Sequence, residues 1–211
     1  AIAKTYFANK EGINSENMKV VSLMPCIAKK EECNREELLI PEGIRETDYS
    51  ISVKEFANML KRYGIDLNSL EDGTFDSPLG DSTGAADIFA NTCGVMEAVA
   101  RTASLWLTNE VKNVEFESVR GLSGTREATL TLNDLTLKLC VVSGLGNARK
   151  VLEGIKDGSL HYDAIEVMAC PGGCVNGGGQ PLHKDMAQID VIKARQAGMY
   201  NIDKNKPVRI S

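Results

Sequence analysis

Short apolar runs alternate with amphipathic stretches along the chain of 211 residues. Short runs of adjacent apolar and β-branched residues are typical of buried strands, whereas apolar residues spaced three or four positions apart are typical of helices. The pattern predicts strands over residues 19–23, 114–120, 135–142 and 162–169, and helices over residues 52–63, 84–109, 147–157 and 185–197. The charged residues 27–37 fit a helical turn or an exposed loop, and residues 66–83, with Gly, Pro and several Asp, predict a loop.

The order of these elements predicts the fold class. Strands that alternate with helices indicate the α/β class, with a mainly parallel sheet flanked by helices. The helix over 52–63 has a clear start, because Ser52 followed by Glu55 forms a capping box. Ligands of open α/β sheets bind outside the carboxyl ends of the strands. Residues 24–26 (Met-Pro-Cys) and 170–174 (Cys-Pro-Gly-Gly-Cys) each follow a predicted strand, so these two segments are the candidate site.

Charge and composition exclude some functions. The chain carries 24 Lys and Arg against 29 Asp and Glu, a net charge of −5, and has no basic tail. We therefore expect neither nucleic-acid binding nor attraction to an anionic membrane. The apolar runs are far shorter than the roughly 20 residues of a membrane span, so we expect no membrane insertion. Six cysteines are too few for a disulfide scaffold of this length, which favours a reducing, cytoplasmic location.

Cysteines at the two strand ends indicate metal chemistry. Cys170 and Cys174 flank a Pro and two Gly, and the glycines allow the backbone to fold closely around a large group. A redox pair is possible, but this spacing suits metal ligation better. With Cys26, the pair resembles an iron–sulfur site assembled across a fold more than a zinc site built from two knuckles. Of the other cysteines, Cys93 and Cys140 lie in apolar segments and fit core packing.

Other side chains near these cysteines are ambiguous. Cys33 fits an exposed thiol or an opportunistic fourth ligand, because it lies in a charged stretch. Two interpretations of Lys29 are equally good: it donates a hydrogen bond to an anionic ligand of the metal, or it is a charged side chain in solvent. Met24 and Met168 each precede a candidate ligand by two residues, and fit either a soft lining of the site or packing at a strand end.

Several motifs resemble those of the iron-only (FeFe) hydrogenase large subunit. Residues 24–32 (Met-Pro-Cys-Ile-Ala-Lys-Lys-Glu-Glu) resemble its second signature, and residues 166–181, which contain Cys-Pro-Gly-Gly-Cys-Val-Asn-Gly-Gly-Gly, resemble its third. Residues 94–98 and 193–203 resemble further segments of the same family. The resemblance extends over essentially the whole chain, and the long third signature makes it specific.

The resemblance implies an H-cluster, in which a 4Fe-4S cubane is joined to a diiron unit that carries CO, cyanide and a dithiolate. It implies that Cys26, Cys170 and Cys174 are cubane ligands and that Cys174 also bridges to the diiron unit. It further implies that Lys29 hydrogen-bonds a cyanide, and that Met24 and Met168 line the diiron pocket. The catalytic residues expected from the resemblance are Lys29 and Cys174; the reaction is reversible H2 oxidation.

The family's first signature, which supplies a fourth cubane ligand, is not found among residues 1–211. We therefore expect these residues to be the C-terminal portion of the H-cluster domain, with one lobe and parts of the second lobe of the two-lobed hydrogenase fold. The expected partners are the N-terminal half of that domain and an electron carrier such as ferredoxin. Alone, the chain is expected to be inactive.

Three alternatives stay open at the level of sequence. An iron–sulfur assembly factor of the Nar type shares the fold and the cluster cysteines but lacks the diiron unit. An H2 sensor shares the signatures, and Cys93, which replaces an expected small residue, leaves this subtype open. The isolated chain could also hold zinc, or nothing, at a site of three cysteines.

Overall fold

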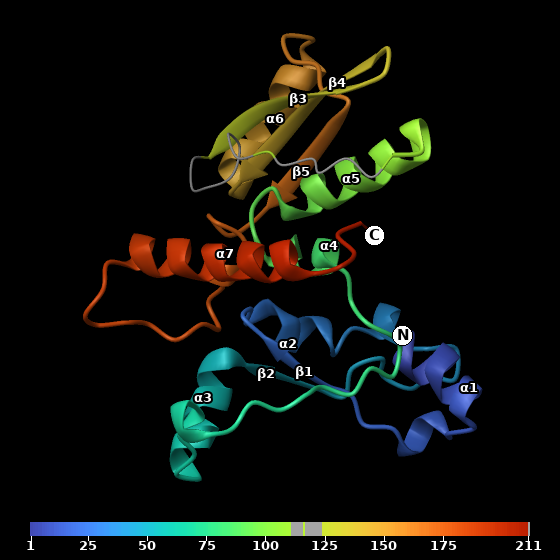
Figure 1. The fold of residues 1–211 in the computed structure, drawn as a ribbon, viewed down its shortest axis with the longest axis vertical. Coiled ribbons are helices and arrows are strands. Elements are labelled where there is room, and N and C mark those ends of the chain that lie inside the picture. Colours follow the sequence, from blue (N-terminus) through green and yellow to red (C-terminus); the bar gives the residue numbers. More distant parts are fainter. Residues whose placement is uncertain (111–115, 117–123, 211) are drawn as a thin grey trace. The chain divides into compact units, whose positions relative to one another are not determined.

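The computed structural model describes residues 1–110, 116 and 124–210, and the chain divides into two compact units. The first unit comprises Ala1–Asp81 together with Gly177–Leu182, and the second comprises Ser82–Asn176 together with His183–Ser211. In Figure 1 residues 1–81 of the first unit run from blue to green, residues 177–182 of the same unit are orange, and the second unit runs from green to red. The glycine-rich segment after Cys174 thus belongs to the first unit, although its neighbours in sequence on both sides belong to the second.

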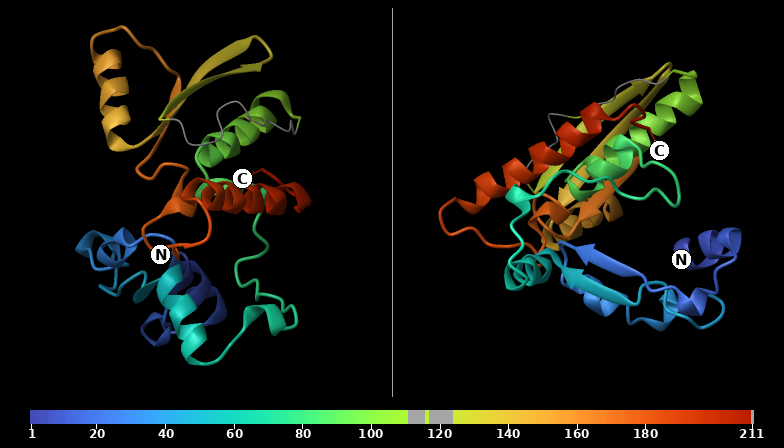
Figure 2. Two further views of the ribbon diagram at one scale, coloured as in Figure 1. Left: turned by 90° about the vertical axis from the view of Figure 1, so that its left-hand side faces the viewer. Right: turned by 60° about the horizontal axis from the view of Figure 1, so that its bottom comes forward.

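The first unit contains a small parallel sheet. Its strands are β1 (Val21–Met24) and β2 (Tyr49–Ser52), which pair in parallel from Val21 opposite Tyr49 to Met24 opposite Ser52 (Figure 2). The helices are α1 (Ala8–Glu11), α2 (Ala28–Glu32) and α3 (Val53–Arg62), with a π-helical turn over Ala3–Phe7 and 3-10 turns over Ser15–Asn17, Glu36–Leu38 and Leu67–Ser69. The predicted capping box is present, because Ser52 and Glu55 exchange hydrogen bonds at the start of α3.

The second unit contains a mixed sheet in the order β3-β4-β5. The hairpin of β3 (Thr125–Leu132) and β4 (Leu135–Ser143) is antiparallel, and β5 (Ala164–Met168) pairs in parallel with β4. The helices are α4 (Gly84–Asp87), α5 (Gly94–Thr108), α6 (Leu145–Lys156) and α7 (Gln188–Asn205), with 3-10 turns over Ile88–Ala90 and Cys174–Asn176.

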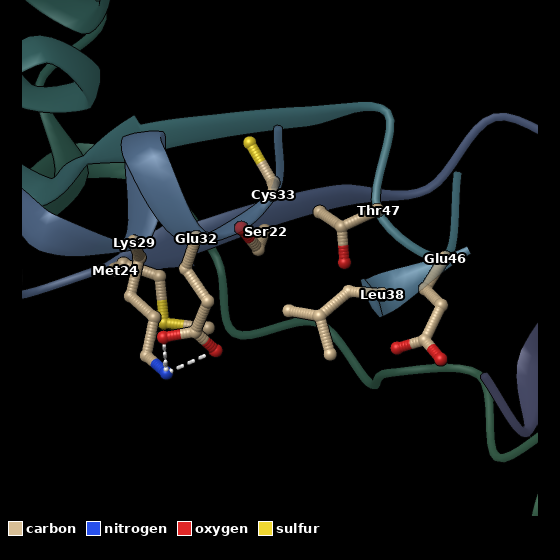
Figure 3. A pocket seen from close by; sticks show the side chains of 8 residues that line it. All are labelled: Ser22, Met24, Lys29, Glu32, Cys33, Leu38, Glu46 and Thr47. Carbon is tan, nitrogen blue, oxygen red and sulfur yellow. Dashed lines mark hydrogen bonds and ion pairs between the residues drawn. The ribbon is translucent and has the colours of Figure 1, made fainter. Parts of the chain in front are cut away.

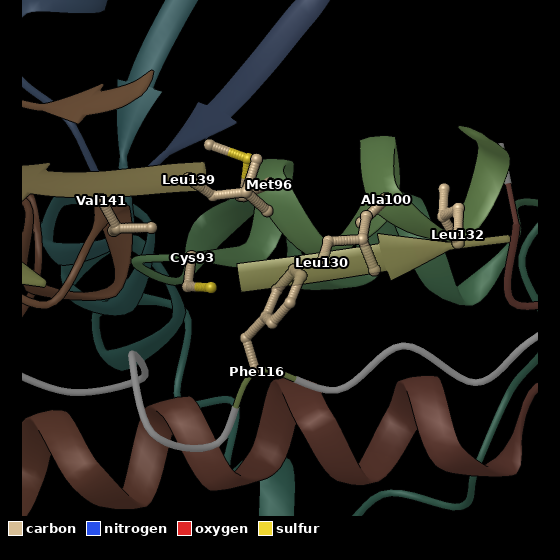
Figure 4. Close-up of a cluster of buried hydrophobic side chains, with 8 residues drawn as sticks. All are labelled: Cys93, Met96, Ala100, Phe116, Leu130, Leu132, Leu139 and Val141. Atoms are coloured by element: carbon tan, nitrogen blue, oxygen red, sulfur yellow. The ribbon is translucent and has the colours of Figure 1, made fainter. Parts of the chain in front are cut away.

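Alternation along β4 gives the sheet of the second unit two buried faces. Leu139 and Val141 point to a cluster formed with α5 and β3, which Figure 4 shows together with Cys93 and Phe116. Cys140, Val142 and two residues of α6 form a second cluster. Because successive side chains of a strand point to opposite faces, α5 covers one face of this sheet and α6 covers the other.

The α/β class and the mainly parallel pairing are confirmed, since two of the three strand pairings in the described part of the chain are parallel. Three of the four predicted helices are present, over residues 53–62, 145–156 and 188–205. The last helix ends at Asn205 rather than near residue 197. The sequence pattern missed β2 and β3, and the strand expected over 114–120 lies outside the described residues apart from Phe116.

The single helix expected over residues 84–109 is wrong, because the structure breaks it into α4, a 3-10 turn and α5. The chain turns at residues 91–93, where Cys93 has a left-handed backbone with φ of 76°. At the next residue, Gly94, a side-chain carbon would overlap the carbonyl group of Ile88. The tight turn therefore needs a glycine at this position, and a continuous helix does not form despite the apolar, alanine-rich sequence.

No helix within the described ranges has the length and apolar character that crossing a membrane requires.

Candidate metal centre

In the first unit, the carboxyl end of β1 delivers one candidate thiol. Met24 is the last paired residue of the strand, Pro25 and Cys26 follow it, and α2 begins two residues after Cys26. The thiol of Cys26 is half-buried. A short strand followed at once by a helix turn therefore places this side chain at the strand end, as the sequence pattern predicted.

A cavity of about 110 Å³ lies beside this strand end (Figure 3). Met24, Lys29, Glu32 and Cys33 are among the residues that line it. The ammonium Nζ of Lys29 contacts both carboxylate oxygens of Glu32, at 2.6 and 2.5 Å. The thioether of Met24 lies next to this ion pair in Figure 3. The structure thus brings together Met24 and Lys29, which the resemblance assigned to one pocket, and adds Cys33 to the same wall.

The glycine-rich segment after the second cysteine pair packs against the same strand end. The amide of Gly179 donates a hydrogen bond to the carbonyl of Pro25 (2.9 Å), and the amide of Lys54 donates to the carbonyl of Gly179 (2.9 Å). A side-chain carbon at Gly179 would lie 2.9 Å from Cβ of Ser52 and 3.0 Å from the carbonyl carbon of Pro25. Only glycine fits this contact, so Gly179 has a structural cause within the first unit.

In the second unit, β5 ends at Met168 and leads into the loop of residues 170–174. Gly172 and Gly173 in this loop have φ of 84° and 95°, a backbone that strongly favours glycine. A side-chain carbon at Gly173 would lie 2.7 Å from the amide nitrogen of Thr92 and would overlap the carbonyl oxygen of Ala90. The loop therefore lies directly against the turn that precedes α5.

Hydrogen bonds fix the backbone of this loop. The carbonyl of Gly172 accepts from the amide of Thr92 (3.2 Å) and from Nε2 of Gln196 on α7 (2.9 Å). Nδ2 of Asn176 donates to the carbonyl of Pro171 (3.0 Å), and Arg195 donates to the carbonyl of Val175 (3.1 Å). The loop is thus held by its own turn and by two neighbouring elements, while the thiol of Cys170 is half-buried and that of Cys174 is exposed.

The buried carboxylate of Glu166 connects β5 to the start of α5 through hydrogen bonds. The sequence pattern did not identify this residue as a helix cap. Glu166 accepts hydrogen bonds from the amides of Cys93 (2.6 Å) and Met96 (2.8 Å), and so caps the start of α5 from the neighbouring strand. Burial raises the pKa of Glu166. Its partners lie about 70 residues away in sequence, so no local capping signal reveals it.

The half-buried Met168 lines a groove of about 330 Å³ between α5 and β5, with Met96, Val99 and Val167 among its neighbours. Met168 is the last residue of β5 and lies two residues before Cys170, so its role in lining the site stays a prediction. The groove also fits the alternative, in which Met168 simply packs at the end of its strand, because α5 and β5 form all its walls.

The six cysteines, all within the described residues, form no disulfide. Cys93 and Cys140 are fully buried, as expected for core residues, and burial raises the pKa of the Cys140 thiol. The three candidate ligands are divided between the two units, with Cys26 in the first and Cys170 and Cys174 in the second. In the part of the chain that the structure describes, no three His, Cys, Asp or Glu side chains converge on one point.

The donor set suits an iron–sulfur group. The three candidate thiols are exposed or half-buried, unlike the two core thiols, and the nearby side chains are soft thioethers and one cation. Iron–sulfur clusters are held by cysteine thiolates, with backbone donors and local charge adjusting their potential. Neither histidine is near these thiols in sequence, which makes a mixed cysteine and histidine zinc site a poorer match.

Comparisons with known proteins agree with this chemistry. The family described as "Iron only hydrogenase large subunit, C-terminal domain" matches residues 1–178. The NADP-reducing hydrogenase subunit HndD of Solidesulfovibrio fructosivorans is 48% identical over 100% of the chain and 36% of its own length. The periplasmic Fe hydrogenase large subunit of Nitratidesulfovibrio vulgaris is 45% identical over 86% of the chain and 43% of its own length.

Among solved structures, the FeFe-hydrogenase HydA1 of Chlamydomonas reinhardtii matches with a TM-score of 0.80 and 34% identity, over 99% of the chain and 59% of that protein. More distant matches are proteins named as cytosolic Fe-S cluster assembly factors, at 34% identity or below. The chain therefore spans little more than a third of the HndD subunit and about three-fifths of the solved hydrogenase.

Proposed function

Because this chain belongs to the iron-only hydrogenase large-subunit family, we propose that it forms part of an oxidoreductase that interconverts H2 with protons and electrons. Its relatives are hydrogenases, and the assembly factors are more distant, so the hydrogenase interpretation has better support than the Nar-type alternative. The observation that carries the proposal is the loop of residues 170–174. Its glycines fix the backbone by close contacts, and it presents one half-buried and one exposed thiol.

We propose that Cys26, Cys170 and Cys174 are three ligands of the cubane, and that Cys174 also joins the cubane to the diiron unit. Two features support this assignment. Each cysteine follows the carboxyl end of a parallel strand, where ligands of α/β folds bind. In addition, Gly179, only five residues after Cys174, is hydrogen-bonded to Pro25, the neighbour of Cys26.

When bound, the H-cluster supplies the open iron position at which H2 is split or formed. The role of Lys29 is to donate hydrogen bonds from Nζ to a cyanide ligand. The cation is available for this at the cavity wall, where Glu32 now holds it and where Met24 supplies an apolar neighbour. Met168 supplies the corresponding thioether from the second unit. Cys174 and Lys29 are therefore the residues on which activity most depends.

The partners of the chain are part of the same proposal. The N-terminal half of the hydrogenase domain supplies the fourth cubane ligand, and an electron carrier such as ferredoxin exchanges electrons with the assembled enzyme. Without that half, the chain is expected to be inactive. A cytoplasmic location stays a prediction from cysteine usage, since one relative is named as a periplasmic hydrogenase.

The test is anaerobic reconstitution with iron and sulfide, followed by assay of both elements, for the chain mixed with the remaining part of the HndD subunit. We expect about four irons per chain for the unmodified protein, as in a cubane. The Cys174→Ser variant should lose most of this iron. Cys33→Ser is the matched control, because Cys33 is a half-buried thiol outside the proposed ligand set.

Equal iron in Cys174→Ser and Cys33→Ser would show that Cys174 is not a ligand. Zinc in place of iron after purification would favour a structural zinc site. After maturation of the complete enzyme, infrared bands of CO and cyanide distinguish a hydrogenase from an assembly factor, which should show none.

A further inference from the structure

Gln196 on α7 connects the cysteine loop, residues 170–174, to the rest of the second unit. The residue is almost fully buried, with 8% of its surface exposed. Its Nε2 donates a hydrogen bond to the carbonyl of Gly172 (2.9 Å), and its backbone carbonyl accepts one from Nδ2 of Asn91 (3.3 Å). One residue of α7 therefore contacts both the loop and the turn that precedes α5.

Two adjacent glycines make the cysteine loop conformationally soft without outside contacts. Gly172 and Gly173 both have a left-handed backbone. Glycine loses more conformational freedom on folding than any other residue, so ordering this backbone is costly. Within the loop, the amide of Gly173 donates to the carbonyl of Cys170 (3.0 Å), which closes a tight turn. Hydrogen bonds from neighbouring elements must then select how this turn is oriented.

The carbonyl of Gly172 is the point at which neighbouring elements hold the loop. It lies two residues from each cysteine and accepts from the amide of Thr92 (3.2 Å) as well as from Gln196. Gly172 and Gln196 are both buried, so bulk water does not replace a lost donor without cost. The bond from Gln196 is thus the contact through which α7 fixes the backbone between the two cysteines.

We propose that Gln196 is a positioning residue for the cluster ligands. Its hydrogen bond to Gly172 holds the backbone between Cys170 and Cys174 in the conformation that presents both thiols to the iron–sulfur group. This inference rests on the proposed function. Residues that orient metal ligands from outside the ligand set change metal affinity roughly 10–100-fold when they are substituted. Gln196 lies beyond residues 1–178, which match the family, so membership of the family does not assign this role.

The competing explanation is that Gln196 only stabilises the second unit as a whole. The two explanations differ in which thiols become accessible when the hydrogen bond is lost. Cys140 is fully buried in the core of the same unit, so it becomes accessible only when the unit opens. Cys170 is half-buried in the loop, so release of the loop exposes its thiol while the core stays closed.

Alkylation of the iron-free chain by iodoacetamide, followed by mass spectrometry of each cysteine peptide, separates these explanations. Gln196→Met keeps the approximate length of the side chain and removes the donor. In this variant, Cys170 should be alkylated about fivefold faster, as expected for the loss of one buried hydrogen bond. The alkylation rate of Cys140 should not change, and neither should that of Cys26 in the first unit.

Lys193→Met is the matched control, because it places the same side chain at an exposed position of the same helix, three residues away. Its alkylation rates should equal those of the unmodified chain. Gln196→Glu is a second test variant, which keeps the shape of the side chain but presents a carboxylate to the carbonyl of Gly172. It should also accelerate alkylation of Cys170. Far-ultraviolet circular dichroism verifies that each variant is folded.

Iron retention tests the consequence for the metal centre. The chain is mixed with the remaining part of the HndD subunit, reconstituted with iron and sulfide, and then exposed to the chelator EDTA. Iron should be lost about tenfold faster from Gln196→Met than from the unmodified protein or from Lys193→Met.

Equal alkylation of Cys170 in Gln196→Met and in the unmodified chain overturns the proposal. Parallel acceleration at Cys170 and Cys140 overturns it as well, because the whole unit is then destabilised. Faster alkylation of Cys170 with unchanged loss of iron refutes the positioning role. The proposed function fails separately, if the unmodified protein binds no iron, whereas normal iron binding with unchanged alkylation in the variant refutes only the role of Gln196.

Discussion

Substitution of Gly173 by Ala tests whether the cysteine loop is packed as the structure shows. The backbone of Gly173 has φ of 95°, and a left-handed conformation costs a side-chain-bearing residue about 1–2 kcal/mol. The added carbon would also lie 2.7 Å from the amide nitrogen of Thr92, so the loop or the turn before α5 must move. Overpacking of this kind adds about 1–3 kcal/mol, which gives a total of about 2–5 kcal/mol.

The same unit contains a matched control. Gly158 has φ of 80°, but a side-chain carbon there would have no neighbour within 4 Å. Gly158→Ala should therefore cost only the backbone strain of about 1–2 kcal/mol. The difference between the two losses in free energy of unfolding measures the contact between the cysteine loop and the turn at residues 90–92.

Urea unfolding followed by far-ultraviolet circular dichroism measures both effects, because the helices of the second unit lose their signal when it unfolds. Iron uptake provides a second comparison, since a shifted loop should bind less iron while Gly158→Ala should bind as much as the unmodified chain. If the two variants lose stability equally, within about 0.5 kcal/mol, the close packing of Gly173 is refuted.

Two further predictions concern buried and exposed charges. Asp203 is fully buried and accepts two hydrogen bonds from the Arg101 guanidinium (2.8 and 3.0 Å), so Asp203→Asn should lower the free energy of unfolding by about 3 kcal/mol, against a negligible effect of Asp185→Asn on the surface; equal urea midpoints would contradict this. The pKa of Glu55 falls from 4.5 to about 2, chiefly through the hydrogen bond from Lys30 and then through those from Ser52. A lowered pKa stabilises the folded state above the unfolded pKa, and the stabilisation is lost as the pH falls from 4.5 towards 2. Glu55→Gln should flatten this part of the stability profile, measured by circular dichroism, and an unchanged slope would refute the assignment.

Local sequence signals determined those elements whose stabilising contacts are close in sequence. The capping box of Ser52 and Glu55 predicted the start of α3, because both partners lie within one helical turn. The apolar runs likewise predicted β1, β4 and β5 at nearly their observed bounds, and hence the positions of Cys26 and Cys170 at strand ends. The resemblance added the family, which the comparisons confirm.

Only the tertiary structure revealed the turns and strands that are stabilised by residues distant in the sequence. The turn before α5 needs Gly94, and it is capped by the carboxylate of Glu166 on β5, some 70 residues away. One glycine in an alanine-rich stretch did not predict the turn by itself. β2 and β3 were missed because neighbouring strands, rather than their own composition, stabilise them. Gly179 is required by its contact with Pro25, which is distant in the sequence. Sequence alone thus predicted the candidate ligands Cys26, Cys170 and Cys174, whereas only long-range packing showed why Gly173 and Gly179 near them must be glycine.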